Sequence, residues 1–308
     1  MSSQTERLMT RAEHLYSIGQ LDGAIDTLRE ALTDDPDLGE AHAWLAACLI
    51  RKRRLHAADM EARMALTLEP DMILSHWVGA ELGLAKRDFE SAGRHIEALL
   101  ARAPEQSAFH LLKARWLSLS HREAEILPVL ERARECDPED PDTLAELAQW
   151  HCRKGDLAEA VRYATEALTL SAENQAALIA MGHVLLAQGD TEGAREHALA
   201  ALQSDPEDTG ALGLLTQIKA RSNPLLGLWW RYAAWGQRVG PTQNIIVLLI
   251  AFVVYRVLTI ATADAGATGL SAGIQIAWLA VVVYSFAGPA IFHRALKKEL
   301  SAVQLKKF

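Results

Sequence analysis

The sequence is short of cysteine, of proline and glycine, and of phenylalanine and tyrosine. Its 308 residues include 3 Cys, 10 Pro, 19 Gly, 6 Phe and 5 Tyr. Cys48, Cys136 and Cys152 are too few and too far apart for a disulfide framework, which predicts a reducing compartment. The modest proline and glycine counts argue against a long disordered segment. No apolar run follows the charged residues at the start, so we expect no N-terminal export signal.

Positive charge is scarce in most of the chain and abundant at its end. Residues 1–222 carry a net charge of −14, whereas residues 223–308 carry +6. A nucleic-acid partner would need clustered cations, so the acidic part argues against one. The basic and hydrophobic final part is suited to an anionic membrane surface, which predicts membrane lipid as a partner.

Motifs for catalysis and for cofactor binding are missing as well. The sequence has no GxGxxG, P-loop, GxSxG or HExxH pattern, so we expect no enzyme activity and no cofactor. His42, His76 and His110 are 34 residues apart and invite a metal interpretation. In a stack of helices such positions lie ~8–10 Å apart per step, too far to share one zinc ion. We therefore expect a packing role for these histidines and no metal site.

A 34-residue period runs through the first 208 residues. Small residues keep this period in several columns, and one of them holds Ala24, Ala58, Ala92, Ala160 and Ala194. Prolines close most units at the same spacing, at Pro36, Pro70, Pro104, Pro138 and Pro206. Glycine stands in the middle of three units, at Gly19, Gly155 and Gly189, where Arg53, Arg87 and His121 replace it in the others. Each unit is therefore predicted to hold two helices, the first ending at the glycine position and the second before the proline.

This pattern resembles the tetratricopeptide repeat, a 34-residue helix-turn-helix unit with small-residue columns and a closing proline. We predict an all-α fold with six repeats, at 5–38, 39–72, 73–106, 107–140, 141–174 and 175–208, and a capping helix at 209–221. Pro128 falls inside the second helix of the fourth repeat and should kink that helix or delay its start. The resemblance implies a right-handed superhelical solenoid over residues 1–222.

The resemblance also implies that the first helices line a concave groove that binds a protein partner through a helical or extended peptide segment. Matching the groove positions residue by residue selects six polar and aromatic candidates, Glu13, Tyr16, Trp77, Glu81, Arg115 and Gln149. Some family members clamp a carboxylate with lysine, arginine and asparagine in their first repeats. Here those positions hold Met9, Glu13, Ala43 and Ala47, which disfavours that class of ligand. Trp77 is either the centre of a binding surface or a core residue.

The composition changes after residue 222. Residues 223–243 are predicted to form a linker and an interfacial helix, because their aromatic residues suit a membrane–water boundary: Trp229, Trp230, Tyr232 and Trp235. Two apolar stretches, about 244–263 and 270–292, each have roughly the 20 residues that cross a bilayer. A basic amphipathic tail follows at 293–308. We therefore predict a two-helix transmembrane hairpin over residues 244–292.

The cations around this hairpin predict its orientation. They lie before the first stretch and after the second, and the connecting loop has none, so the repeats should be cytoplasmic. The alanine-rich style suggests a bacterial inner membrane. Arg256, inside the first stretch, either reaches back to the interface or marks a polar site. Gly269, Gly273 and Ala277 could seat the other helix or a second copy of the chain.

Together these features favour a membrane-anchored adaptor or scaffold that binds proteins on the cytoplasmic side of a membrane. The alternative is an accessory subunit of a membrane enzyme, transporter or secretion complex, which binds through the transmembrane hairpin. A chain that acts without its two apolar stretches would exclude the alternative.

Overall fold

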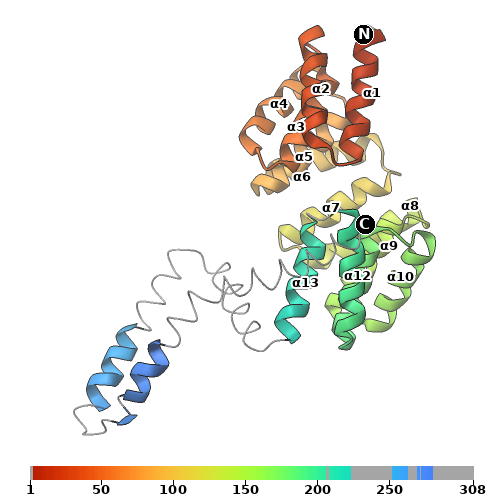
Figure 1. Cartoon of the computed structure of the whole chain (residues 1–308). Coiled ribbons are helices and arrows are strands. Elements are labelled where there is room, and N and C mark those ends of the chain that lie inside the picture. The colour runs from red at the N-terminus through yellow and green to blue at the C-terminus, as the bar shows by residue number, and fades with distance from the viewer. Residues whose placement is uncertain (1–2, 206–207, 223–251, 263–268, 271, 280–308) are drawn as a thin grey trace, which may run out of the picture. The chain divides into compact units, whose positions relative to one another are not determined.

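The computed structural model describes residues 3–205, 208–222, 252–262, 269–270 and 272–279, and every regular element within these ranges is helical (Figure 1). The chain divides into two compact units, Met1–Trp150 and His151–Phe308. Consecutive helices form the pairs that the period predicts, with the first helix of each repeat at odd numbers from α1 to α11. The bounds are α1 (Ser3–Ser17), α2 (Leu21–Asp34), α3 (Gly39–Arg51), α4 (Leu55–Leu68), α5 (Ile73–Lys86), α6 (Phe89–Arg102), α7 (Ser107–Leu119), α8 (Ile126–Cys136), α9 (Pro141–Lys154), α10 (Leu157–Leu170), α11 (Gln175–Gln188), α12 (Thr191–Ser204) and α13 (Thr209–Ser222).

The six predicted repeats and the capping helix are confirmed by these bounds. The fourth repeat is the least regular, as Pro128 predicts: a short 3-10 turn, Glu123–Glu125, precedes α8, which has 11 residues. Pro128 is the third residue of that helix, where a missing amide hydrogen costs no hydrogen bond. The capping helix α13 packs on α11 and α12, with Leu214 and Leu215 fully buried.

The small-residue columns lie where paired helices come closest. Ala24, Ala58, Ala92, Ala160 and Ala194 are all fully buried. The approach is close in the third repeat, where a Cβ added to Gly83 of α5 would lie 2.9 Å from the backbone nitrogen of Ala92 in α6. Larger side chains in this column would separate the helices, which explains the periodic alanine.

The turn between the two helices of a repeat has a left-handed residue whether or not it is glycine. Gly19, Gly155 and Gly189 have φ of 77°, 84° and 95°. The three replacements adopt the same conformation, with φ of 58° at Arg53, 61° at Arg87 and 60° at His121. Residues with a Cβ are strained in this conformation. The three turns with glycine are therefore relaxed, and the three turns with arginine or histidine are strained.

The stored strain predicts a stabilising substitution. Arg53→Gly should raise the free energy of unfolding by about 0.5–1 kcal/mol, because glycine adopts a positive φ without steric cost. The matched control is Gly155→Ala in the equivalent turn, which should lower it by about 1 kcal/mol. Urea unfolding followed by circular dichroism measures both, and a destabilised Arg53→Gly chain would show that the turn is not strained.

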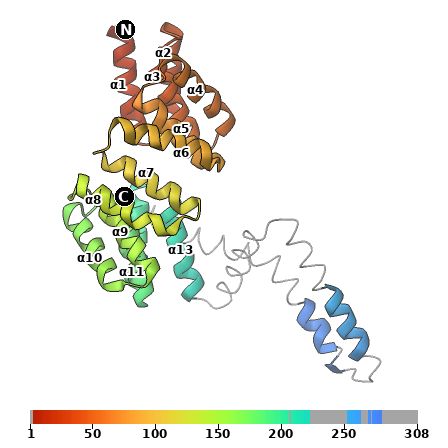
Figure 2. The same cartoon turned by 180° about the vertical axis from the view of Figure 1, so that it is seen from behind.

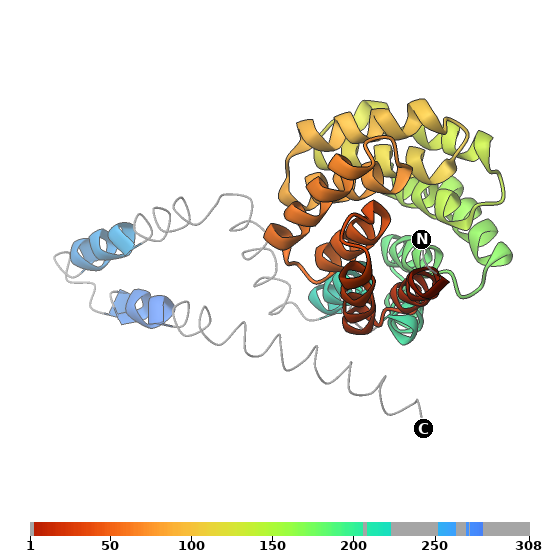
Figure 3. The same ribbon diagram turned by 90° about the horizontal axis from the view of Figure 1, so that it is seen from above.

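Two short helical segments are described near the C-terminus, at 252–262 and 272–279. They lie side by side in all three views (Figures 1, 2 and 3), and the rings of Tyr255 and Trp278 stack between them with centroids 4.8 Å apart. Among the described residues, nothing lies within 4 Å of a Cβ added to Gly269 or Gly273. The described contact between the two segments is aromatic, and the seating of a helix on these small residues stays a prediction.

Among the residues that the structure describes, no helix combines the length and the apolar character needed to cross a membrane. The predicted stretches 244–263 and 270–292 overlap the described residues only at 252–262, 270 and 272–279. The aromatic candidates Trp229, Trp230, Tyr232 and Trp235 and the tail 293–308 lie outside the described residues.

Candidate functional site

The predicted binding residues of the first compact unit lie on the first helices of its repeats. We call Tyr16, Arg51, Trp77, Glu81 and Arg115 the first-helix face, because they come from α1, α3, α5, α5 and α7. Trp77 and Glu81 are one helical turn apart, so their side chains share a side of α5. Of the other candidates, Glu13 is half-buried on α1 and Gln149 is half-buried on α9.

An ion pair joins α5 to α7 across this face. Nη1 of Arg115 donates to both carboxylate oxygens of Glu81, at 2.9 and 3.0 Å. The arginine side chain is 56% exposed and the glutamate 19%, so the pair lies at the boundary between core and solvent. The two charges cancel, which leaves the middle of the first-helix face close to neutral.

Tyr16 anchors the α1 end of the face. Its ring lies 5.1 Å from the ring of Trp44, and the guanidinium of Arg51 lies 5.1 Å from its centroid. Arg51 also donates from Nη1 to the Tyr16 backbone oxygen at 3.2 Å. Burial raises the pKa of the Tyr16 hydroxyl, with a further rise from the Glu81 carboxylate, while Arg51 opposes the change. Tyr16 is therefore a neutral hydrogen-bonding group at physiological pH.

Sequence reasoning missed Arg51 and Trp44. Neither belongs to a repeating column. The long arginine side chain reaches back from the end of α3 to α1, a contact that depends on how successive repeats stack. No signal in the residue pattern could have found it.

Trp77 combines features of a core residue and of a binding residue, the two alternatives that the sequence leaves open. Its side chain is half-buried and packs against two apolar clusters, one centred on α2 to α4 and the other on α5 to α7. It therefore fills volume between repeats and still presents part of its ring to solvent.

The three spaced histidines have a local structural role. The Nε2 atoms of His42, His76 and His110 lie 3.0, 2.9 and 2.7 Å from the carbonyl oxygen of the proline six residues earlier. A carbonyl only accepts, so each ring donates its Nε2 hydrogen and fastens the turn to the next helix. In the described part of the chain, no cluster of three or more His, Cys, Asp or Glu side chains is arranged to hold a metal ion.

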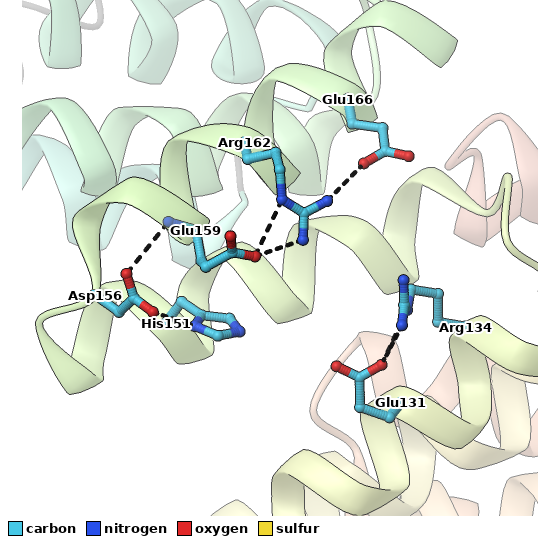
Figure 4. A network of polar contacts seen from close by, with 7 residues as sticks. All are labelled: Glu131, Arg134, His151, Asp156, Glu159, Arg162 and Glu166. Carbon is cyan, nitrogen blue, oxygen red and sulfur yellow. Dashed lines mark hydrogen bonds and ion pairs between the residues drawn. The ribbon is translucent and has the colours of Figure 1, made fainter.

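Polar networks of the second unit are also structural. Asp156 accepts hydrogen bonds from the backbone N–H of Glu159, as the N-cap of α10, and lies 3.3 Å from Nδ1 of His151 (Figure 4). Arg162 pairs with Glu159 and Glu166 and stacks over Tyr163, 3.9 Å from its centroid. In the first unit, the same figure shows Arg134 paired with Glu131 one turn earlier. Such pairs, three or four residues apart, stabilise the helices that carry them.

The cysteines lack the properties of catalytic nucleophiles. Burial raises the pKa of all three thiols, that of Cys48 to about 11. A thiol with a raised pKa stays protonated near neutral pH, and the thiolate is the reactive form.

Comparison with known families agrees with this helical architecture. Family models described as tetratricopeptide repeat match residues 9–66 and 152–218, one in each compact unit. The chain contains tetratricopeptide repeats. The helices between the two matched ranges keep the same 34-residue period, which extends the pattern over all six predicted repeats. No curated protein matches the chain.

Solved structures share this tetratricopeptide fold at low sequence identity. The structure of PilW, a widely conserved type IV pilus biogenesis factor, is 20% identical with a TM-score of 0.54, and the match covers 70% of this chain and 100% of PilW. That of pilF from Pseudomonas aeruginosa is 17% identical with a TM-score of 0.51, covering 70% and 97%. The APC/C hetero-tetramer Cut9-Hcn1 gives 14% identity and a TM-score of 0.55, covering 70% and 42%. At these identities the likeness concerns the fold alone.

Proposed function

We propose that this chain is a scaffold that binds a protein partner through the first-helix face of its N-terminal tetratricopeptide repeats. The observation that carries the proposal is the half-exposed Trp77 beside the Glu81–Arg115 ion pair, a combination of ring and charge-neutral polar group. Tryptophan and arginine are enriched at binding hot spots. An apolar helical or extended segment of the partner, with few charges, suits such a surface.

Removing the Trp77 ring should weaken binding of the partner. Trp77→Ala is expected to lower affinity about 30-fold or more, the loss of ~2 kcal/mol typical of a hot-spot residue. The measurement is a crosslinked pull-down of the detergent-extracted full chain, followed by titration of the partner it captures. Met60→Ala, which removes an exposed side chain from the second helix α4, is the matched control and should bind normally.

Trp77 also contributes to packing, so the variant must be shown to be folded. It must retain its helical circular dichroism at the temperature of the titration, and Trp77→Phe replaces Trp77→Ala in the test if it does not. If a folded variant binds every captured partner as tightly as the native chain, the first-helix face is not the recognition surface.

We also propose that the C-terminal residues anchor the scaffold in a membrane, with the repeats in the cytoplasm of a bacterial cell. The exposure of apolar side chains in the described segment 252–262 supports this proposal. Six large apolar side chains there are about half exposed or more: Phe252, Val253, Val254, Val257, Leu258 and Ile260. Exposed apolar surface at this density calls for lipid or protein to cover it. A shortened chain that ends at Ser222 should leave the membrane fraction entirely, and its continued sedimentation with membranes would contradict the anchor.

The open face of Gly269, Gly273 and Ala277 favours a second candidate function. Small exposed residues at a spacing of four allow close helix packing, either with a second copy of the chain or with a subunit of a membrane complex. In that case the chain is an accessory subunit that binds through its hairpin. A partner captured by the full chain and by Trp77→Ala, but lost from the chain ending at Ser222, would make this the leading function.

We infer that the chain is not an enzyme. The protonated thiols and the structural use of the histidines and acids described above support this inference. A screen of the purified chain for hydrolase and redox turnover tests it, and activity abolished by a single substitution would contradict it.

A further inference from the structure

Two imidazole rings face each other inside the third repeat. His76 of α5 and His95 of α6 have their Nδ1 atoms 3.1 Å apart and their ring centroids 5.4 Å apart. The Nε2 hydrogen of His76 is already donated to the Pro70 carbonyl, at 2.9 Å. In the neutral pair, Nδ1 of His76 is therefore the acceptor and Nδ1 of His95 is the donor.

The distance between the two nitrogens leaves room for one hydrogen. The neutral pair has one hydrogen between the two Nδ1 atoms, which His95 donates. The singly charged pair also has one, because charged His76 donates it and His95 carries its own hydrogen on Nε2. A doubly charged pair would place two hydrogens and two positive charges in the same 3.1 Å gap. The pair can accept a first proton but must open to accept a second.

The surroundings limit how far the ring of His95 can turn away from His76. The ring of His95 lies against the α5 backbone at Gly79, where an added Cβ would be 2.8 Å from its Cε1 and Nε2 atoms. Burial lowers the pKa of both histidines. Among the described residues, Arg102 lowers the pKa of His76 further and Asp71 opposes it, but Asp71 is itself paired with Arg102.

The charges around His95 act in the same direction. After burial, the charge on His76 and that on Arg94 of the same helix lower the pKa of His95. Within the described chain, the helices that also pack against α5 and α6, namely α3, α4 and α7, add no charged group that acts on either ring. The Pro70 carbonyl and Asp71 favour the charged form of His76, but no described group favours the charged form of His95.

The neighbouring repeats show that this arrangement is particular to the third repeat. In the second repeat, the position of His95 is taken by Glu61, whose Oε2 lies 2.6 Å from Nδ1 of His42. In the fourth repeat, the equivalent residue opposite His110 is Val129. The same scaffold position thus holds an acid, a histidine or an apolar residue, and two titrating rings meet in one of the three.

We propose that the His76–His95 pair makes the third repeat an acid-sensitive joint, in which a second proton forces α6 away from α5. The joint lies beside Trp77, the next residue on α5 and part of the packing between these helices. Its effect on partner binding rests on the function proposed above, whereas the opening itself does not. The pair stabilises the fold above the ordinary histidine pKa of about 6.5, and this stability is lost as the pH falls below it.

The experiment compares thermal unfolding of the full chain in detergent with that of His95→Gln, between about pH 7.5 and pH 5. Glutamine can still donate to His76 but cannot become charged. The native chain should lose about 4 °C more in Tm over this range than the variant does. The matched control is His110→Gln, which changes the ring that corresponds to His76 in the next repeat and should keep the full acid loss.

A second measurement keeps the proposal testable if His95→Gln does not fold. The imidazole nitrogen chemical shifts of the native chain follow each ring separately, and His76→Gln assigns them. The pair should take up its two protons in steps about one pH unit or more apart. Two rings that charge together near the ordinary pKa, or a His95→Gln chain with the full acid loss, would overturn the proposal. Neither readout requires a partner, so failure here is distinct from failure of the scaffold function.

Discussion

Gly83→Ala should lower the free energy of unfolding by about 2–4 kcal/mol, a large effect for one methyl group. The added Cβ would lie 2.9 Å from the backbone nitrogen of Ala92 and 3.0 Å from its Cα and Cβ. Backbone atoms cannot move aside as the end of a side chain can, so α5 and α6 must separate. The separation would loosen the fully buried Ile96 and Leu99, which pack in the same interface.

The matched control for this prediction is Gly213→Ala. Gly213 also lies inside a helix, α13, but an added Cβ meets nothing within 4 Å. Without a clash, the higher helix propensity of alanine should stabilise the chain by about 0.5–1 kcal/mol. Urea unfolding monitored by circular dichroism measures both variants, and equal effects of the two substitutions would show that the α5–α6 approach is not tight.

Leu214→Ala should cost about 3–5 kcal/mol and detach the capping helix. The Leu214 side chain is fully buried, and α13 packs on both helices of the last repeat. Removing it leaves a cavity under the last helix of the described stack, which packs on only one repeat. Hydrogen exchange should show the loss first in α13 and α11. Leu212→Ala, at a half-exposed position of the same helix, is the control with a small effect.

Gly182 explains why the cap fits at this position. An alanine there would place its Cβ 2.4 Å from Cδ2 of Leu214. The equivalent position of the other five repeats is alanine, so glycine occurs in this column under the capping leucine: Ala12, Ala46, Ala80, Ala114 and Ala148. Gly182→Ala should therefore destabilise by about 1–3 kcal/mol. In Gly182→Ala/Leu214→Val the shorter valine relieves the clash, so the double substitution should cost less than the sum of the two single ones. Additive costs would show that the two side chains do not meet.

The repeat architecture could be predicted because it depends on local chemistry. Proline prevents a helix from continuing past its first turn, and a positive φ is required at the same point of each repeat, even where Arg53 or His121 replaces glycine. Pro128 likewise predicted the short α8 of the fourth repeat. These features act within a few residues of chain, so a period of 34 residues is enough to place them.

The candidate site could be predicted only in part. The family register selected Tyr16, Trp77, Glu81 and Arg115, and the structure brings Tyr16 into the field of Glu81 and pairs Glu81 with Arg115. It could not select Arg51, because the reach of that side chain to Tyr16 depends on the stacking of two repeats.

The sequence alone determined the number of repeats, the ends of their helices and the sharp change of composition after residue 222, because each depends on residue types at short range. Tertiary structure decided which members of a repeating column meet. One position brings His42 to Glu61 and its equivalent brings His76 to His95, so equal spacing yields opposite electrostatics. Packing between helices brings residues 19 positions apart within hydrogen-bonding distance, and what they do there depends on the partner.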